Sequence, residues 1–235
     1  MSSLFPIGES IWLAEGPIVD FHGFPYPTRM VVIRLSKGDL WVWSPIALND
    51  ELTSEVKALG HIAHLISPNK IHHLYLTEWL KVFPSALVWG PASSIRKLRH
   101  IGFQPALTAK APPAWRDEID QFWFHGSFFM DEIVFQHRAS RTAILGDLSE
   151  NFSTGFLEEH WAPWQRRVAK WWRIVDGYGY APLEWRLSWM HREPARVALR
   201  GLLAARPEQV VMAHGEWQRT DGHAYLTHAF AWLKA

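Results

Sequence analysis

Short apolar runs bounded by turn residues alternate along the chain with segments of helical periodicity. Residues 30–35 and 40–44 flank a Lys-Gly-Asp turn, a pattern typical of a β-hairpin. A helix is predicted to begin at Asn49 or Asp50 and to end at Gly60, because a capping side chain opens it and glycine follows it. Further strands are predicted at residues 11–14, 65–67, 87–89, 122–124, 132–135, 142–145 and 210–212, and further helices at residues 74–83, 93–100, 156–175, 194–205 and 225–234.

The order of these elements predicts an α/β (α+β) fold. Hairpins come first, βα alternation follows, and helices with one last strand complete the chain. Two sheets packed face to face with helices outside accommodate this order. Because no linker-like stretch divides the chain, residues 1–235 are expected to form a single domain.

Composition narrows the classes of function. The chain has 24 Lys and Arg against 23 Asp and Glu, so its formal net charge of +1 argues against a nucleic-acid partner. No apolar run reaches the roughly 20 residues of a membrane span, and no signal-peptide pattern begins the chain, so we expect a soluble, cytoplasmic protein without an integral membrane segment. The lack of cysteine excludes thiolate chemistry, and any metal site must use His, Asp or Glu.

Polar residues follow three of the predicted strands directly. His72 and His73 come after residues 65–67, Asp147 follows residues 142–145, and His214 follows residues 210–212. Ligand sites of α/β proteins assemble at the carboxyl ends of strands, and this donor set suits zinc, iron or manganese. Taken singly, each residue also has a structural interpretation: Asp147 as a turn cap, and the histidines as turn or loop residues.

The order of these motifs resembles the metallo-β-lactamase-like hydrolase fold. That fold has an early hairpin region, a loop of the form His-x-His-x-Asp-His, a metal-bridging Asp after a later strand, and a final His that is often followed by Gly. Residues 65–73, 145–147 and 212–215 stand in the corresponding places. The segments His-His-Leu-Tyr-Leu-Thr-Glu-Trp, Glu-x-Val-Phe-x-His-Arg-x-Ser-Arg and Gly-Asp-Leu resemble more closely the uncharacterised domain-of-unknown-function family 4336. The resemblance implies a four-layer αβ/βα sandwich of two mixed sheets with helices outside.

The loop motif departs from the pattern of the larger superfamily. If His73 is the last His of the motif, His72 stands where the Asp belongs, and Lys70 and Pro68 replace the first two His ligands. A third ligand of that first metal would follow residues 122–124, where His125 is a loose candidate. The resemblance therefore implies that only the second metal site survives.

The surviving second site implies that the protein binds one divalent metal, zinc, iron or manganese, and no organic cofactor. His73, Asp147 and His214 would be its ligands and His72 a possible fourth. Such a site would serve the hydrolysis of an ester, amide or phosphoester bond in a small-molecule substrate, although the catalytic residues stay unknown. The alternative is a non-catalytic protein whose cleft binds a small anion through Lys70 and rim aromatics. Whether the chain is an enzyme is open at this point.

Three further residues are candidates for the cleft or for support of the ligands. Glu78 follows the His pair on a predicted helix, where it would orient a ligand His or lie in solvent. His125 and His137 follow other predicted strands. The aromatic segment 21–26 is predicted to form a rim over a cleft or packed surface, and the 15 tryptophans leave a homodimer open.

Overall fold

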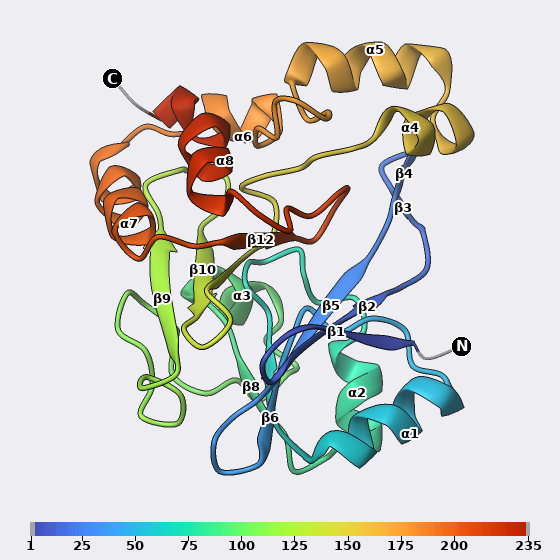
Figure 1. Ribbon diagram of the computed structural model, residues 1–235, viewed down its shortest axis with the longest axis vertical. Helices are drawn as coiled ribbons and strands as arrows, with labels where there is room; N and C mark the ends of the chain where they lie inside the picture. Colours follow the sequence, from blue (N-terminus) through green and yellow to red (C-terminus); the bar gives the residue numbers. More distant parts are fainter. Residues whose placement is uncertain (1–2, 234–235) are drawn as a thin grey trace.

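The computed structural model describes residues 3–233 and builds them into two large β-sheets with helices outside (Figure 1). The first sheet is six-stranded, in the order β1-β2-β5-β6-β7-β8. Its strands are β1 (Leu4–Gly8), β2 (Ile11–Glu15), β5 (Arg29–Arg34), β6 (Asp39–Trp43), β7 (His61–Ile66) and β8 (Leu87–Trp89). Strands β6, β7 and β8 are parallel and the others antiparallel, so three carboxyl ends meet at one edge.

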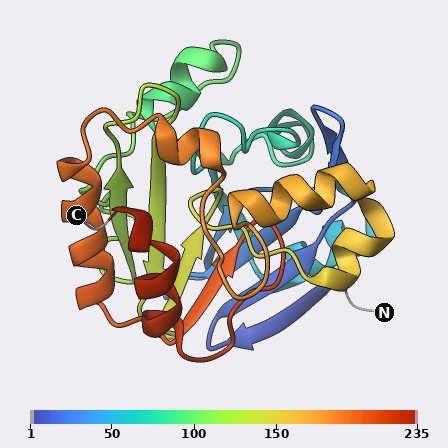
Figure 2. The same ribbon diagram turned by 90° about the horizontal axis from the view of Figure 1, so that it is seen from above.

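The second sheet is four-stranded, in the order β12-β11-β10-β9. It consists of β9 (Ile119–Phe124), β10 (Glu132–His137), β11 (Thr142–Leu145) and β12 (Gln209–Met212), of which only β11 and β12 are parallel. Helices α7 (Glu193–Ala204) and α8 (Gly222–Ala229) lie against its outer side, as Figure 2 shows from above. Helix α1 (Asp50–Leu59) packs on the six-stranded sheet. The result is the layered arrangement of mixed sheets and outer helices that the sequence predicted.

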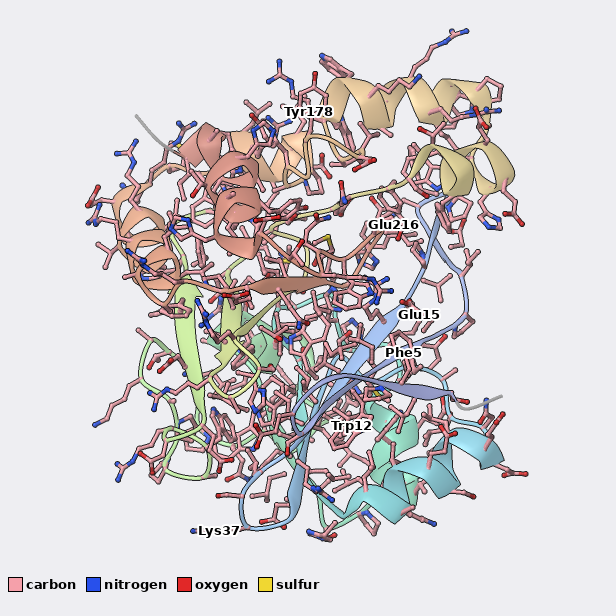
Figure 3. All side chains as sticks on the ribbon, viewed as in Figure 1. Phe5, Trp12, Glu15, Lys37, Tyr178 and Glu216 are labelled. Carbon is pink, nitrogen blue, oxygen red and sulfur yellow. The ribbon has the colours of Figure 1, made fainter. Side chains whose placement is uncertain are left out.

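Large apolar side chains from both sheets share one core. Trp41 of β6 meets Phe135 of β10 edge to face, with ring centroids 4.9 Å apart, and both rings are fully buried. Such a pair contributes about 0.5–1.5 kcal/mol beyond the burial of its area. Figure 3 shows side chains filling the space between the sheets, while Lys37 projects from the tip of the β5–β6 turn. The two sheets are therefore held together by direct packing of their inner faces.

Several local predictions are confirmed. The β5–β6 hairpin forms around the Lys-Gly-Asp turn, and α1 begins where predicted because the Asn49 side chain accepts from the Leu52 backbone N–H at 2.7 Å. Two further predicted helices form with shorter bounds, α2 (Leu76–Val82) and α3 (Ala92–Lys97). None of the helices within residues 3–233 is both long and apolar enough to cross a membrane.

The prediction of one continuous helix at residues 156–175 is wrong. It is two helices, α4 (Thr154–His160) and α5 (Pro163–Trp172). Pro163 has no N–H to donate and its ring crowds the carbonyl four residues earlier, so it starts a new helix instead of continuing the old one. The last helix also begins earlier than predicted and ends at Ala229, followed by a short 3-10 turn, η1 (Ala231–Leu233); Lys234 lies outside the described residues.

The aromatic segment 21–26 takes part in a small hairpin that the sequence did not specify. Strands β3 (Val19–Phe21) and β4 (Phe24–Tyr26) pair around His22 and Gly23, whose φ angles are +53° and +88°. Two consecutive positive φ angles make the tight turn that matches the twist of paired strands. Strand β1 and helix α6 (Leu183–Leu187) are likewise additions to the predicted elements.

Candidate functional site

Three side chains that follow three parallel strands meet in one buried cluster. His72 lies in the loop after β7, Asp147 follows β11, and His214 follows β12. One nitrogen or carboxylate oxygen from each lies within 4.8 Å of the others. Two separate sheets contribute to the cluster, because the carboxyl ends of their parallel strands open toward the same region.

Asp147 lies between the two histidines. Its Oδ2 is 3.1 Å from Nε2 of His72, and its Oδ1 is 3.3 Å from Nε2 of His214. The side chains are 5–10% exposed, so little solvent separates them. Nitrogen and carboxylate donors therefore converge at the floor of the site.

A hydrogen bond at Nδ1 of each imidazole fixes the orientation of the ring, so that Nε2 is directed toward Asp147. Nδ1 of His214 lies 2.7 Å from the carbonyl oxygen of Pro27, which can only accept, so Nδ1 carries the proton. In the neutral ring, Nε2 of His214 then keeps its lone pair for the cluster. Nδ1 of His72 lies 2.8 Å from Oγ of Ser44, which likewise directs Nε2 inward. Partners of this kind orient the imidazoles of metal sites.

Opposite charges of Asp147 and His72 stabilise one another. Burial disfavours ionisation of Asp147, but the neighbouring His72 and His214 outweigh it and hold the pKa of the carboxyl well below its usual range. Burial likewise opposes protonation of His72, yet the charge of Asp147 raises the pKa of this imidazole above its ordinary value. His72 and Asp147 thus form a buried ion pair.

The donor set fits a divalent metal. Two imidazole nitrogens and one carboxylate, with their ligand atoms within 4.8 Å of one another, could together hold such an ion. The sequence predicted His73 as a ligand and His72 as a possible fourth. The structure places His72 in the cluster and His73 outside it, on the cavity wall, where burial and then Lys97 lower its pKa. Adjacent residues point in different directions, so only one of the pair turns inward.

Two other candidates from the sequence bind elsewhere. Lys70 donates to the carbonyl oxygen of Phe129, and its ammonium lies 4.5 Å from the centre of that ring, so Lys70 is absent from the cavity lining. Glu78 accepts from the backbone N–H of Leu48 at 2.8 Å, which joins α2 to the loop before α1. Neither side chain contacts the three-residue cluster.

The remaining two candidates also have structural partners. His125 stacks on Trp123 with ring centroids 3.9 Å apart. His137 ends β10 at the edge where β9 begins, and its Nδ1 lies 2.8 Å from Oγ of Ser140. Neither belongs to the cluster.

Residues that the sequence analysis did not single out complete the site. Asn69 and Glu132 are fully buried, and both bond to Asp147 or to its backbone. Tyr26 donates to Glu150 at 3.1 Å, and its ring packs edge to face on His214. In the sequence, these residues could have been noticed only as polar side chains next to apolar ones, and that pattern is a weak indication of a site.

The cluster opens into a cavity of about 280 Å³. Apolar side chains form much of its wall, and Phe21 of the β3–β4 hairpin lines it. Lys97 and Glu150 are two of the residues with titratable side chains in the lining. Burial and then the charge of Asp147 raise the pKa of Glu150 well above its ordinary value, so this carboxyl holds a proton more firmly than an exposed one.

Solved structures of metallo-β-lactamases share the fold. The metallo-β-lactamase TMB-1 superposes with a TM-score of 0.67 at 13% identity, covering 98% of this chain and 96% of that one. DIM-1, from a crystal exposed to ceftazidime, gives 0.65 at 16% identity with 98% and 95% covered. FIM-1 from Pseudomonas aeruginosa, in a mono-zinc form, gives 0.60 at 13% identity with 96% and 92% covered. At such identities the likeness establishes a divergent metallo-β-lactamase-like fold.

Sequence comparison gives the family. No curated protein sequence matches the chain. Residues 9–154 match the family described as a domain of unknown function, DUF4336, and this segment includes His72 and Asp147 but ends before His214. The chain belongs to the DUF4336 family and has a divergent metallo-β-lactamase-like fold.

Proposed function

We propose that this protein is a metal-dependent hydrolase that binds one divalent cation through His72, Asp147 and His214. The observation that carries the proposal is the convergence of the three donor atoms within 4.8 Å at the floor of a cavity. The description of FIM-1 as a mono-zinc form supports a single metal on this fold. Zinc, iron and manganese all accept this mixture of nitrogen and oxygen donors.

A bound divalent cation would supply Lewis acidity toward the carbonyl or phosphoryl group of an ester, amide or phosphoester. The chain itself supplies the holding and proton-handling groups. Pro27 keeps the proton of His214 on Nδ1, so the imidazole presents Nε2 without needing to change tautomer. Apolar side chains that form much of the cavity wall would contact the uncharged part of a substrate.

Glu150 is our candidate for the group that delivers a proton to the leaving group. Its side chain lines the same cavity, and Tyr26 donates to its Oε2 at 3.1 Å. The raised pKa keeps a proton available on this carboxyl at a pH where an exposed glutamate has lost it. Under this proposal, Glu150→Gln lowers turnover of a substrate with a poor leaving group more than that of one with a good leaving group.

Metal content tests the proposal directly. The purified, tag-free protein should be stripped with a chelator, reloaded with zinc, manganese or ferrous iron, desalted and measured by inductively coupled plasma mass spectrometry. We expect one metal per chain, lost in Asp147→Ala and kept in Asp117→Ala, a matched control whose side chain is 87% exposed. Failure of the wild-type chain to take up any of the three metals would overturn the proposal.

A second candidate function is recognition of a small anion without catalysis. Lys97 favours it, because this cation lines the cavity and forms no ion pair within the described part of the chain. Under this candidate function, the cationic contact is Lys97 in place of Lys70, which does not line the cavity. Calorimetric titration with inorganic phosphate should then give binding to the metal-free protein that Lys97→Ala abolishes and Lys81→Ala preserves. No heat of binding in the wild-type protein would rule against this candidate.

A further inference from the structure

A single amide side chain lies between the two carboxylates at the base of the site. Nδ2 of Asn69 donates to Oδ2 of Asp147 at 2.7 Å and to Oε2 of Glu132 at 2.8 Å. Asn69 and Glu132 are fully buried and Asp147 is 4% exposed. Both protons of the amide nitrogen are therefore used, one on each carboxylate.

The oxygen of the same amide holds the loop that carries His72. Oδ1 of Asn69 accepts from the backbone N–H of Ile71 at 3.0 Å and from that of His72 at 3.3 Å. These bonds fold the loop back on its own first residues. One side chain thus fixes the backbone of one candidate ligand and the carboxylate of another.

Glu132 completes the connection from the neighbouring strand. Its Oε1 accepts from the backbone N–H of Gly146 at 2.8 Å, and its Oε2 accepts from that of Asp147 at 2.9 Å. The β11 turn that presents Asp147 is therefore attached to the first residue of β10. Burial and then the charge of Asp147 raise the pKa of Glu132 to about 7, while these donors favour its charged form.

We propose that Asn69 and Glu132 are positioning residues that set the spacing of His72 and Asp147 and keep the site at one metal. The inference rests on the proposed function, because it concerns the same cation. The amide nitrogen of Asn69 already donates to Oδ2 of Asp147, the oxygen that also lies 3.1 Å from Nε2 of His72, while Oδ1 lies 3.3 Å from Nε2 of His214. A second cation at Oδ2 would therefore have to displace this neutral donor.

The chemistry of the position requires an amide. An aspartate there would place a third buried carboxylate beside two others. An alanine would remove one donor from each of two buried carboxylate oxygens and leave the backbone N–H groups of Ile71 and His72 without their acceptor. Only a side chain with two N–H donors and one acceptor satisfies all four neighbours. We therefore expect Asn69→Ala and Asn69→Asp to change metal binding without touching any ligand.

The test is metal affinity, measured by competition with a chromogenic chelator on the full-length chain. Asn69→Ala should weaken the affinity for zinc about 10- to 100-fold, the range that supporting residues of metal sites show. The visible spectrum of the cobalt-loaded protein should also shift, because the relative placement of His72 and Asp147 changes. Asn49→Ala is the matched control: it removes a helix cap and lowers stability, yet it lies outside the cluster and should leave affinity and spectrum unchanged.

Glu132→Gln is the second variant, and it decides the matter if Asn69→Ala does not fold. Both carboxylate oxygens of Glu132 accept from N–H groups, and in the glutamine one of them becomes an NH2 group that cannot accept. The turn at Asp147 should therefore loosen, and the affinity for zinc should fall as well. Zinc affinities of both variants within twofold of wild type, with an unchanged cobalt spectrum, would overturn the positioning role while leaving the proposed metal site intact. A wild-type chain that binds no metal would instead remove the proposed function itself. A wild-type stoichiometry of two metals per chain would overturn the single-metal part of the inference.

Discussion

His214 donates its Nδ1 proton to the carbonyl oxygen of Pro27 across 2.7 Å, although the two residues lie 187 positions apart in the chain. The bond ties the loop after β12 to the residues just before β5, and so joins the two sheets at the site. It also decides the tautomer of the histidine, which is why Nε2 is the atom presented to Asp147. The site therefore depends on the closure of the whole sandwich as well as on its three donors.

The two adjacent histidines should differ in their importance for metal binding. We expect His72→Ala to lose the metal, because its Nε2 lies in the cluster, and His73→Ala to retain one metal per chain, because its ring lies on the cavity wall. Metal analysis of both variants, with circular dichroism to establish folding, provides the measurement. Retention of metal in His72→Ala with loss in His73→Ala would restore the ligand assignment predicted from the sequence.

Gly146→Ala should destabilise the protein by roughly 1–3 kcal/mol, the usual cost of overpacking a core. A Cβ atom at this position would lie 2.7 Å from Oε2 of Glu132 and 3.0 Å from Nδ2 of Asn69. Urea unfolding of the metal-free protein measures the loss. Gly102→Ala is the control, since nothing lies within 4 Å of its added methyl group; an equal effect in both variants would contradict the steric explanation.

Buried His137 should make the folded state less stable as the pH falls below about 6.5, the ordinary pKa of histidine. Burial lowers the pKa of His137 in the folded protein, so the unfolded chain takes up a proton there first. The free energy of unfolding then decreases by up to about 1.4 kcal/mol per pH unit for this group, until the folded-state pKa is reached. His137→Gln should flatten that part of the stability profile, and an unchanged slope in this variant would contradict the prediction.

Trp41→Ala should cost about 3–5 kcal/mol of stability, because it removes a fully buried ring from the interface between the sheets. Trp171→Ala, on α5 with an exposed fraction of 71%, should change stability by less than about 0.5 kcal/mol. Chemical unfolding of the two variants compares them. Similar losses would mean that Trp171 is covered in solution, for example by a second copy of the chain.

The sequence by itself determined much of the local structure and named all three residues of the cluster, with His72 only as a possible fourth ligand beside His73. Asn49 caps α1, and the Lys-Gly-Asp turn closes the β5–β6 hairpin, because both depend on neighbouring residues only. Asp147 and His214 were identifiable because each directly follows a short apolar strand. Local backbone preferences and strand ends can be read along the chain without knowledge of distant contacts.

Only the tertiary structure decided which histidine turns inward, what supports it and which cation faces the cavity. His72 replaces His73 in the cluster because the Asn69 side chain folds their loop, while Ser44 of the neighbouring segment orients the ring. Lys97 replaces Lys70 on the cavity wall because Lys70 is bound at Phe129. The Asn69–His72 bond is local, but the partners Ser44 and Phe129 lie 28 and 59 positions away from His72 and Lys70. The direction of a loop side chain is therefore settled only when distant segments come together.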